Sequence, residues 1–335
     1  MIAPAQASAA GKVLTAGETM ALLDPTREGA IEAGLSFTLR IAGAESNFGV
    51  ALARLGVSVT WISRLGADPF GDVVYKTLMD EGLDLRHVRR EPGAPTGVFF
   101  KWREGGASRV VYYRRGSAAS LLGPTDVPDD ALDDVSLVHL TGITMALSGS
   151  ARDLVVELAA RARKSGAIVL FDPNYRPALW RGPQEAAVVQ REVLPLVDWY
   201  LCGFEEGGLL FGSETCEDLL EELAKAGIEN AVVRIGSRGA VVASGEGRAE
   251  VRPAHVRGVA DEIGAGDGFA AGFAYGLLNG WEPVACVQAG NAIAATALAG
   301  TGDWETFPRL EEIEDELATM RSGALVKPVH EQGAR

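Results

Sequence analysis

Cysteine is scarce in this chain of 335 residues, which holds only Cys202, Cys216 and Cys286. Three scattered cysteines are too few for a disulfide framework, and the chain has no C-x-x-C pair of the kind found in metal and redox centres. We therefore expect reduced thiols in a cytoplasmic protein.

Positive charge is also scarce, because 31 Lys and Arg residues stand against 45 Asp and Glu residues, giving a formal net charge of -14. Nucleic acids and anionic membranes bind basic surfaces, so we expect neither as a partner. An anionic substrate would need a local positive pocket. The charge balance thus leaves small-molecule chemistry as the simplest expectation.

Long apolar runs are missing as well, and the stretch that comes closest to spanning a membrane, residues 264–278, is interrupted by glycines. Residues 1–11 lack the basic and apolar segments of a signal peptide, and we expect 1–11 and 322–335 to be flexible tails. With 47% hydrophobic residues, the rest of the chain fits one large α/β domain with an appendage, or two smaller domains.

Strand and helix patterns alternate along most of the sequence. Strand patterns occur at 12–16, 57–63, 136–140, 168–171 and 199–202. Helical patterns occur at 42–55, 69–81, 150–164, 183–194, 264–278, 283–298 and 310–320. This alternation is typical of a parallel, doubly wound sheet covered by helices. A hairpin pattern, 231–235 and 240–243 around the turn GSRG, extends it.

A second, smaller sheet is predicted outside this core. Residues 37–41 alternate polar and apolar side chains, and 96–102 and 109–115 form a hairpin pattern around EGGA. These segments are expected to form a β lid. The lid would comprise 21–42 and 95–117, and the α/β core would comprise 12–20, 43–94 and 118–321.

The stretch DEIGAGDGF at residues 261–269 has the features of an active site. Gly264 and Gly266 let the backbone approach a ligand closely, and the helix that follows begins with unpaired N–H groups that favour an anion. Asp267 stands beside that anion site. A carboxylate in this position can accept the proton of a nucleophilic hydroxyl, as phosphoryl transfer requires, although an ordinary helix cap is the alternative.

The GAGD motif resembles the signature of the ribokinase-like (PfkB) carbohydrate kinases. Three further stretches, AGAESN at 42–47, YYRRGSAAS at 112–120 and DPNYRPALW at 172–180, are similar to the 2-keto-3-deoxygluconate kinases of that family. The motifs stand in the family's order between about residues 14 and 304. The resemblance implies a three-layer α/β/α fold with a mostly parallel sheet and a β lid. It also implies ATP-dependent phosphorylation of a sugar hydroxyl with a divalent cation such as Mg²⁺.

The resemblance also assigns roles to individual residues. Asp267 would be the base, and Gly264, Ala265 and Gly266 would form the anion hole. The residues expected to contact the sugar are Gly43, Asn47, Phe99, Tyr112, Arg114, Asn174, Arg176 and Asp267. The residues expected to contact the nucleotide are Gly236, Ser237, Gly239, Gly264, Gly266 and Asn291. Glu206 falls where the family has a Glu linked to the metal.

Two arginines indicate an acidic sugar, because Arg114 and Arg176 can each bind a carboxylate through paired hydrogen bonds. The alternatives are a solvated hairpin edge for Arg114 and a surface charge for Arg176. Tyr112 and Tyr113 alternate on one strand, so only one of them can face the sugar.

Some positions depart from the family pattern. Gly203 replaces the Asn of the N-x-x-E motif that precedes Glu206, Glu262 stands where many relatives have Thr, and Phe99 stands where deoxygluconate kinases often have Tyr.

The sequence therefore predicts an ATP-dependent kinase of a 2-keto-3-deoxy sugar acid that forms a dimer through its lid. A kinase of a neutral sugar or nucleoside, such as fructose or ribose, is the nearest alternative. A sugar-binding regulator without turnover is a further one. A dinucleotide-dependent oxidoreductase is disfavoured, because no G-x-G-x-x-G follows the first strand.

Overall fold

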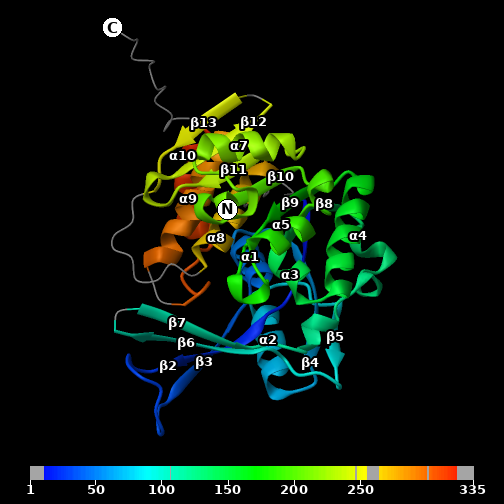
Figure 1. The fold of residues 1–335 in the computed structure, drawn as a ribbon, viewed down its shortest axis with the longest axis vertical. Helices are drawn as coiled ribbons and strands as arrows, with labels where there is room; N and C mark the ends of the chain where they lie inside the picture. Colours follow the sequence, from blue (N-terminus) through cyan, green and yellow to red (C-terminus); the bar gives the residue numbers. More distant parts are fainter. Residues whose placement is uncertain (1–10, 106, 246, 255–263, 300–301, 323–335) are drawn as a thin grey trace, which may run out of the picture.

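The computed structural model describes residues 11–105, 107–245, 247–254, 264–299 and 302–322 (Figure 1). Its core is a nine-stranded sheet in the order β13-β12-β11-β10-β9-β8-β1-β4-β5. The strands are β1 Lys12–Ala16, β4 Val59–Gly66, β5 Val88–Glu91, β8 Val135–Thr141, β9 Ile168–Asp172, β10 Trp199–Gly203, β11 Ala231–Arg234, β12 Ala240–Ser244 and β13 Gly247–Val251. The strands from β11 to β5 pair in parallel, and β12 and β13 add an antiparallel edge.

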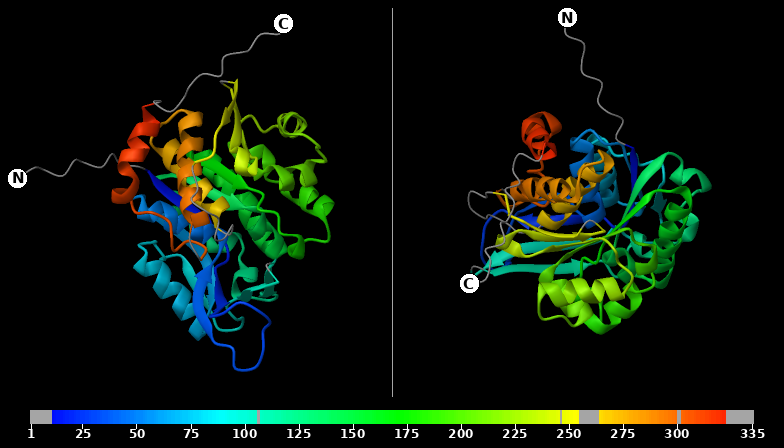
Figure 2. Two further views of the ribbon diagram at one scale, coloured as in Figure 1. Left: turned by 90° about the vertical axis from the view of Figure 1, so that its left-hand side faces the viewer. Right: turned by 90° about the horizontal axis from the view of Figure 1, so that it is seen from above.

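Helices cover both faces of this sheet (Figure 2). One face carries α1 Ala44–Arg54, α2 Pro69–Asp80, α8 Ala265–Leu278, α9 Pro283–Ala299 and α10 Leu310–Arg321. The other face carries α3 Gly142–Leu147, α4 Gly149–Ser165, α5 Pro183–Gln190, α6 Phe204–Phe211 and α7 Cys216–Lys225. Short 3₁₀ turns lie at Ala118–Leu121, Pro124–Asp126, Asp129–Leu132, Pro177–Leu179, Leu194–Leu196 and Gly236–Arg238.

Each core strand feeds two hydrophobic cores because its side chains alternate between the faces. On β1, Val13 packs into the core beneath α1 and α8, whereas Leu14 and Ala16 pack into the core beneath α4. All three side chains are fully buried. The predicted three-layer α/β/α fold is confirmed. No helix in the described part of the chain is long and apolar enough to cross a membrane.

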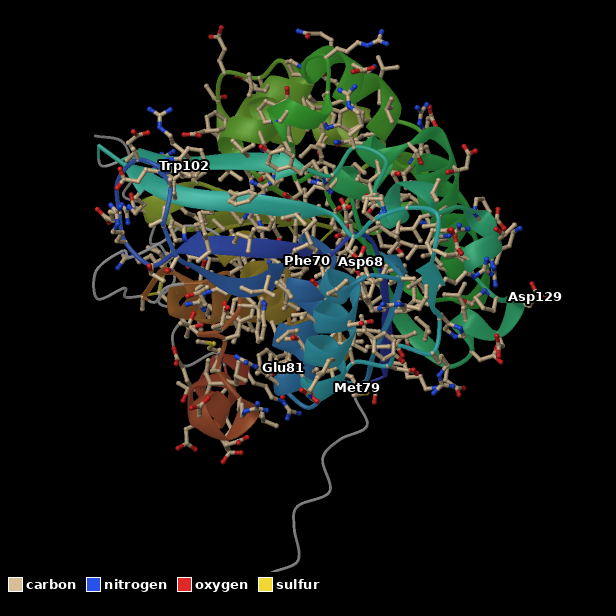
Figure 3. The ribbon with its side chains drawn as sticks, turned by 90° about the horizontal axis from the view of Figure 1, so that it is seen from below. Asp68, Phe70, Met79, Glu81, Trp102 and Asp129 are labelled. Carbon is tan, nitrogen blue, oxygen red and sulfur yellow. The ribbon has the colours of Figure 1, made fainter. Side chains whose placement is uncertain are left out.

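The lid is a separate four-stranded sheet below the core in Figure 1. Its strands are β2 Met20–Pro25, β3 Phe37–Ala42, β6 Val98–Glu104 and β7 Ala107–Tyr113, in the order β3-β2-β6-β7. The predicted strands near 37–41, 96–102 and 109–115 are present, and β2 is an addition. Figure 3 shows α2 beside the lid, with Asp68 and Phe70 at its near end and Trp102 toward the tip of the β6–β7 hairpin.

The largest error in a predicted boundary is at the end of α5. The helical pattern at 183–194 ends as α5 at Gln190, and a 3₁₀ turn, Leu194–Leu196, follows. Pro195 lies in that turn, and because it disfavours a helical Leu194 the helix does not run to 194. The tails expected at 1–11 and 322–335 lie almost wholly outside the described residues.

Candidate active site

The glycine turn before α8 has a conformation that glycine provides at little cost. Gly264 has a φ of 81°, in the left-handed region, and a Cβ at this position would collide with the carbonyl oxygen of Asp303. α8 begins at Ala265, and the N–H of Gly268 is bonded to the Gly264 carbonyl at 2.9 Å. The N–H groups of Ala265 and Gly266 therefore lie ahead of the first intrahelical bond, where an anion is favoured. Glu262 lies outside the described residues.

Asp267, in the first turn of α8, is buried with a relative exposure of 8%. The side-chain amide of Asn47 donates to its Oδ2 at 2.8 Å, and that of Asn174 donates to its Oδ1 at 3.4 Å. Burial raises the pKa of Asp267 to about 7, although the bond from Asn47 and the charge of Arg176 oppose the shift. A carboxylate of this kind can accept a proton near neutral pH.

A cavity of about 440 Å³ opens in front of Asp267, between the lid and the carboxyl ends of the core strands. All eight residues that were expected to contact the sugar line it: Gly43, Asn47, Phe99, Tyr112, Arg114, Asn174, Arg176 and Asp267. Gly264 and Gly266 line it too, so the anion-binding turn and the sugar-facing groups share one space. We call this space the acceptor cavity.

The lid contributes an aromatic wall to the acceptor cavity. Phe99 is buried on the inner side of β6 and stacks on Tyr112, with 5.5 Å between the ring centroids. Tyr113 points to the other side of β7 and is 66% exposed. Tyr112 is therefore the tyrosine of this pair that faces the cavity.

The two arginines of the acceptor cavity differ in their surroundings. Arg114 is bonded to the buried carboxylate of Glu18, with 2.7 Å between Nε and Oε2, and Ser117 also donates to Glu18. Arg176 is exposed, and among the described residues it forms no ion pair. Arg176 thus offers the less neutralised positive charge. Glu18 was not among the predicted site residues.

A second cavity of about 1120 Å³ lies on the other side of the glycine turn. The residues expected to contact the nucleotide line it: Gly236, Ser237, Gly239, Gly266 and Asn291. Gly264 lines the acceptor cavity instead, one residue before Ala265, which lines this one. The side-chain amide of Asn291 is bonded to the Arg252 carbonyl at 2.9 Å. We call this space the nucleotide cavity.

Glu206, Arg234 and Gly266 line both cavities. Arg234, at the end of β11, was not predicted as a site residue. Its Nη1 donates to the Gly266 carbonyl at 3.2 Å, and its Nη2 lies 3.3 Å from both Asp172 Oδ2 and Glu206 Oε1. An arginine that ends a buried strand, with only Ile235 between it and the GSRG turn, is the sequence signal that could have found it.

Both carboxylate oxygens of Glu206 already accept hydrogen bonds from backbone N–H groups. Its Oε1 accepts the N–H of Gly203 at 2.7 Å and its Oε2 accepts the N–H of Tyr175 at 2.9 Å. The described residues also contain no group of three or more His, Cys, Asp or Glu side chains that could hold a metal ion. Within the part of the chain that the structure describes, no cluster of side chains forms a divalent-cation site, and the metal role expected for Glu206 stays a prediction.

The chain matches the profile of the pfkB family of carbohydrate kinases over residues 10–309. It is 35% identical over 313 residues to a 2-dehydro-3-deoxygluconokinase of Bacillus subtilis (strain 168), covering 92% of this chain and 96% of that protein. A 2-dehydro-3-deoxygluconokinase of Thermoproteus tenax is 33% identical over 311 residues, which is 91% of this chain and 93% of that protein.

Solved structures share the fold over most of the chain. A PfkB protein from Polaromonas sp. JS666 has a TM-score of 0.83 and 34% identity, covering 91% of this chain and 99% of that chain. A structure from E. coli described as ribokinase II in complex with ATP and Mg²⁺ has a TM-score of 0.82 and 26% identity, covering 92% of this chain and 99% of that chain.

Proposed function

Because the chain belongs to the pfkB family of carbohydrate kinases and is therefore a phosphotransferase that acts on a sugar hydroxyl, we propose that its acceptor is a 2-keto-3-deoxy sugar acid. The preferred acid is 2-keto-3-deoxygluconate, also written 2-dehydro-3-deoxygluconate. The terminal hydroxyl of the sugar is the group phosphorylated, and ATP is the donor.

One observation carries the substrate assignment: Arg114 and Arg176 line the same cavity as Asp267. A guanidinium group binds a carboxylate through two parallel hydrogen bonds, which a neutral sugar does not require. The sugar acid then lies with its carboxylate toward the arginines and its terminal hydroxyl toward Asp267.

Asp267 acts as the base in this proposal. The sugar hydroxyl gives its proton to the Asp267 carboxylate while its oxygen forms the new bond to the γ-phosphorus of ATP. The bond from that phosphorus to the bridging oxygen of ADP breaks, and ADP leaves with the electron pair. The N–H groups of Gly264, Ala265 and Gly266 stabilise the charge on the transferring group.

ATP binds in the nucleotide cavity in this proposal, with its phosphates toward Gly266 and Arg234. Gly236, Ser237, Gly239 and Asn291 contact the rest of the nucleotide. The divalent cation, which we propose to be Mg²⁺, supplies neutralisation of the phosphate charge. It would be held mainly by the phosphates and by water, because Mg²⁺ needs few protein ligands in such sites.

The test is an ADP-release assay over a panel of acidic and neutral sugars. We expect 2-keto-3-deoxygluconate to give the highest kcat/KM. Faster turnover of fructose or ribose would replace the proposal with the neutral-sugar kinase, which the Glu18–Arg114 ion pair favours because it neutralises one guanidinium. Binding of sugar and ATP without release of ADP would indicate the regulator instead.

The lid, residues 21–42 and 95–117, is also proposed as the dimer surface. Its outer side is apolar: Leu39, Val111 and Tyr113 are 39%, 40% and 66% exposed. Arg109 and Glu104 lie beside this patch as an ion pair of 3.2 Å. A face that carries both signs of charge can pair with the same face of a second copy, even though the whole chain is acidic. An open sheet with exposed apolar side chains is also stabilised when a second copy covers it.

A cytoplasmic location remains a prediction. It is supported by the state of Cys202, Cys216 and Cys286, which are all free thiols in the structure. Thiols of this kind are usual where the surroundings are reducing.

A further inference from the structure

The loop that follows β9 carries two of the groups that face Asp267 in the acceptor cavity. Asn174 donates to the Asp267 carboxylate, and Arg176 lines the cavity two residues later. Asn174 has a φ of 38°, which non-glycine residues rarely adopt. A loop with such a backbone keeps one geometry only if neighbouring groups hold it.

Two carboxylates hold this loop by its backbone. Oδ1 of Asp172 accepts the N–H of Asn174 at 2.8 Å, and Oε2 of Glu206 accepts the N–H of Tyr175 at 2.9 Å. Asp172 is 2% exposed, so its bond is shielded from water. The two carboxylates come from different elements, β9 and the first turn of α6.

The other oxygen of each carboxylate is bonded to the same guanidinium. Nη2 of Arg234 lies 3.3 Å from Oδ2 of Asp172 and 3.3 Å from Oε1 of Glu206. Nη1 of Arg234 donates to the carbonyl of Gly266, in the anion-binding turn. One cation on β11 therefore fixes two carboxylates, and those carboxylates fix the loop.

Removal of this cation would have a defined effect. Asp172 and Glu206 would face each other without a counterion, and two neighbouring carboxylates repel or take up a proton. Either response changes the bonds to the N–H groups of Asn174 and Tyr175. The side chains that bind the acceptor would then shift, in addition to any change at Arg234 itself, which lines both cavities.

We propose that Arg234 is a positioning residue for the sugar: by holding Asp172 and Glu206, it fixes the loop that presents Asn174 and Arg176 to the acceptor. Glu206 is part of this support. The inference rests on the proposed function for the identity of the acid. The support itself does not depend on that identity, because it affects the binding of any acceptor in this cavity.

The test measures binding of 2-keto-3-deoxygluconate by calorimetry in the absence of nucleotide. Arg234→Gln should raise the Kd for the acid about tenfold, the size expected from the loss of one charge-assisted hydrogen bond. Arg234→Lys should recover part of the affinity because the charge stays. Glu206→Gln should raise the Kd severalfold, and the double variant should bind no more weakly than Arg234→Gln, because both changes break one support.

Arg248→Gln is the matched control, since Arg248 is an arginine on β13 that pairs with Glu217 on the surface. It should leave the Kd for the acid unchanged. Steady-state measurements on Glu206→Gln should show a raised KM for the acid and a smaller change in the KM for ATP. Circular dichroism and thermal melting establish that each variant is folded, and Glu206→Gln carries the test if Arg234→Gln does not fold.

Wild-type affinity for the acid in folded Arg234→Gln or Glu206→Gln would overturn the inference, as would a change confined to ATP binding. Failure of the wild-type protein to bind 2-keto-3-deoxygluconate would instead refute the proposed substrate. The same variants would then be compared on the panel sugar that the wild type phosphorylates, and the positioning role would stand or fall on that result.

Discussion

Asn47 and Asp267, which are 220 positions apart in the chain, are joined by a hydrogen bond of 2.8 Å from the amide nitrogen to Oδ2. Asn47 lies in the first turn of α1 and Asp267 in the first turn of α8. The sequence predicted that Asn47 contacts a sugar hydroxyl. The bond shows that its amide also holds the carboxylate that is proposed as the base.

Asp267→Asn should abolish phosphorylation. The amide cannot accept the proton of the sugar hydroxyl, so kcat should fall by about two to four orders of magnitude, the usual range for loss of a positioned base. The Kd for ATP should change little, because Asp267 lines the acceptor cavity and not the nucleotide cavity. Single-turnover assays and nucleotide titration measure the two quantities, and retained turnover would remove Asp267 from the role of base.

Asn47→Asp should move the pH profile of kcat/KM. Burial already raises the pKa of Asp267 to about 7, and the base must be ionised, so activity should fall as the pH drops through 7. A second carboxylate next to Asp267 disfavours ionisation further. The acidic limb of the profile should therefore move to higher pH, and Asn47→Ala serves as the uncharged comparison. If the acidic limb does not move, a group other than Asp267 controls it.

Arg176→Ala should selectively weaken the binding of the acidic sugar. Loss of a paired carboxylate contact should raise the KM for 2-keto-3-deoxygluconate by about 10- to 100-fold while the KM for ATP stays near the wild-type value. Arg181→Ala, in the same loop region with a side chain that is 93% exposed, is the control. If Arg176→Ala keeps the wild-type KM for the acid and prefers a neutral sugar, the substrate assignment is wrong.

Gly264→Ala should reduce both activity and stability. A methyl group there meets the Asp303 carbonyl as well as an unfavourable left-handed backbone. Gly280 isolates the second effect, because it also has a positive φ of 66° but no atom lies within 4 Å of its added Cβ. Gly280→Ala should cost about 1 kcal/mol in the free energy of unfolding, and Gly264→Ala clearly more. Equal melting temperatures for the Gly264→Ala and Gly280→Ala variants would contradict the predicted collision.

Tyr113→Glu should break the proposed dimer. A carboxylate on the outer side of the lid would have to be buried against the second copy, which is costly without a partner. Val188→Glu is the control, because Val188 is an exposed apolar residue of similar accessibility, 67%, on α5. Size exclusion with light scattering measures the mass. A wild-type protein that is monomeric at all concentrations would end the dimer proposal.

The motifs that predicted the family and fold are local ones. AGAESN, the YYRR strand, DPNYR and GAGD each lie at the end of a strand or the start of a helix, where the backbone and a few side chains are fixed by near neighbours. The pfkB family and the α/β/α fold were therefore accessible from the sequence, and both are confirmed. The residues that the motifs assigned to the sugar also line one cavity.

The residues that were missed act through distant partners. Glu18 reaches Arg114 across 96 positions, and Arg234 reaches Asp172 across 62. No pattern of spacing connects such pairs. Two of the missed elements have weak local signals: α6 contains two adjacent glycines, and the apolar part of β2, Met20 to Leu23, is short and does not alternate. Tertiary pairing with β3 and β6 makes β2 a strand.

The position of β1 between β4 and β8 has a consequence for folding. Thr15 on β1 pairs with His139 on β8, and its hydroxyl lies 3.1 Å from that ring, across 124 positions. During synthesis the middle of the sheet can form only after β8 has been made, and the lid strands β2, β3, β6 and β7 are made before that. Non-local pairing of this kind slows folding and leaves strand edges open. In the order of synthesis, the pairing of β1 with β8 is therefore the later of the two pairings that β1 makes, after its pairing with β4.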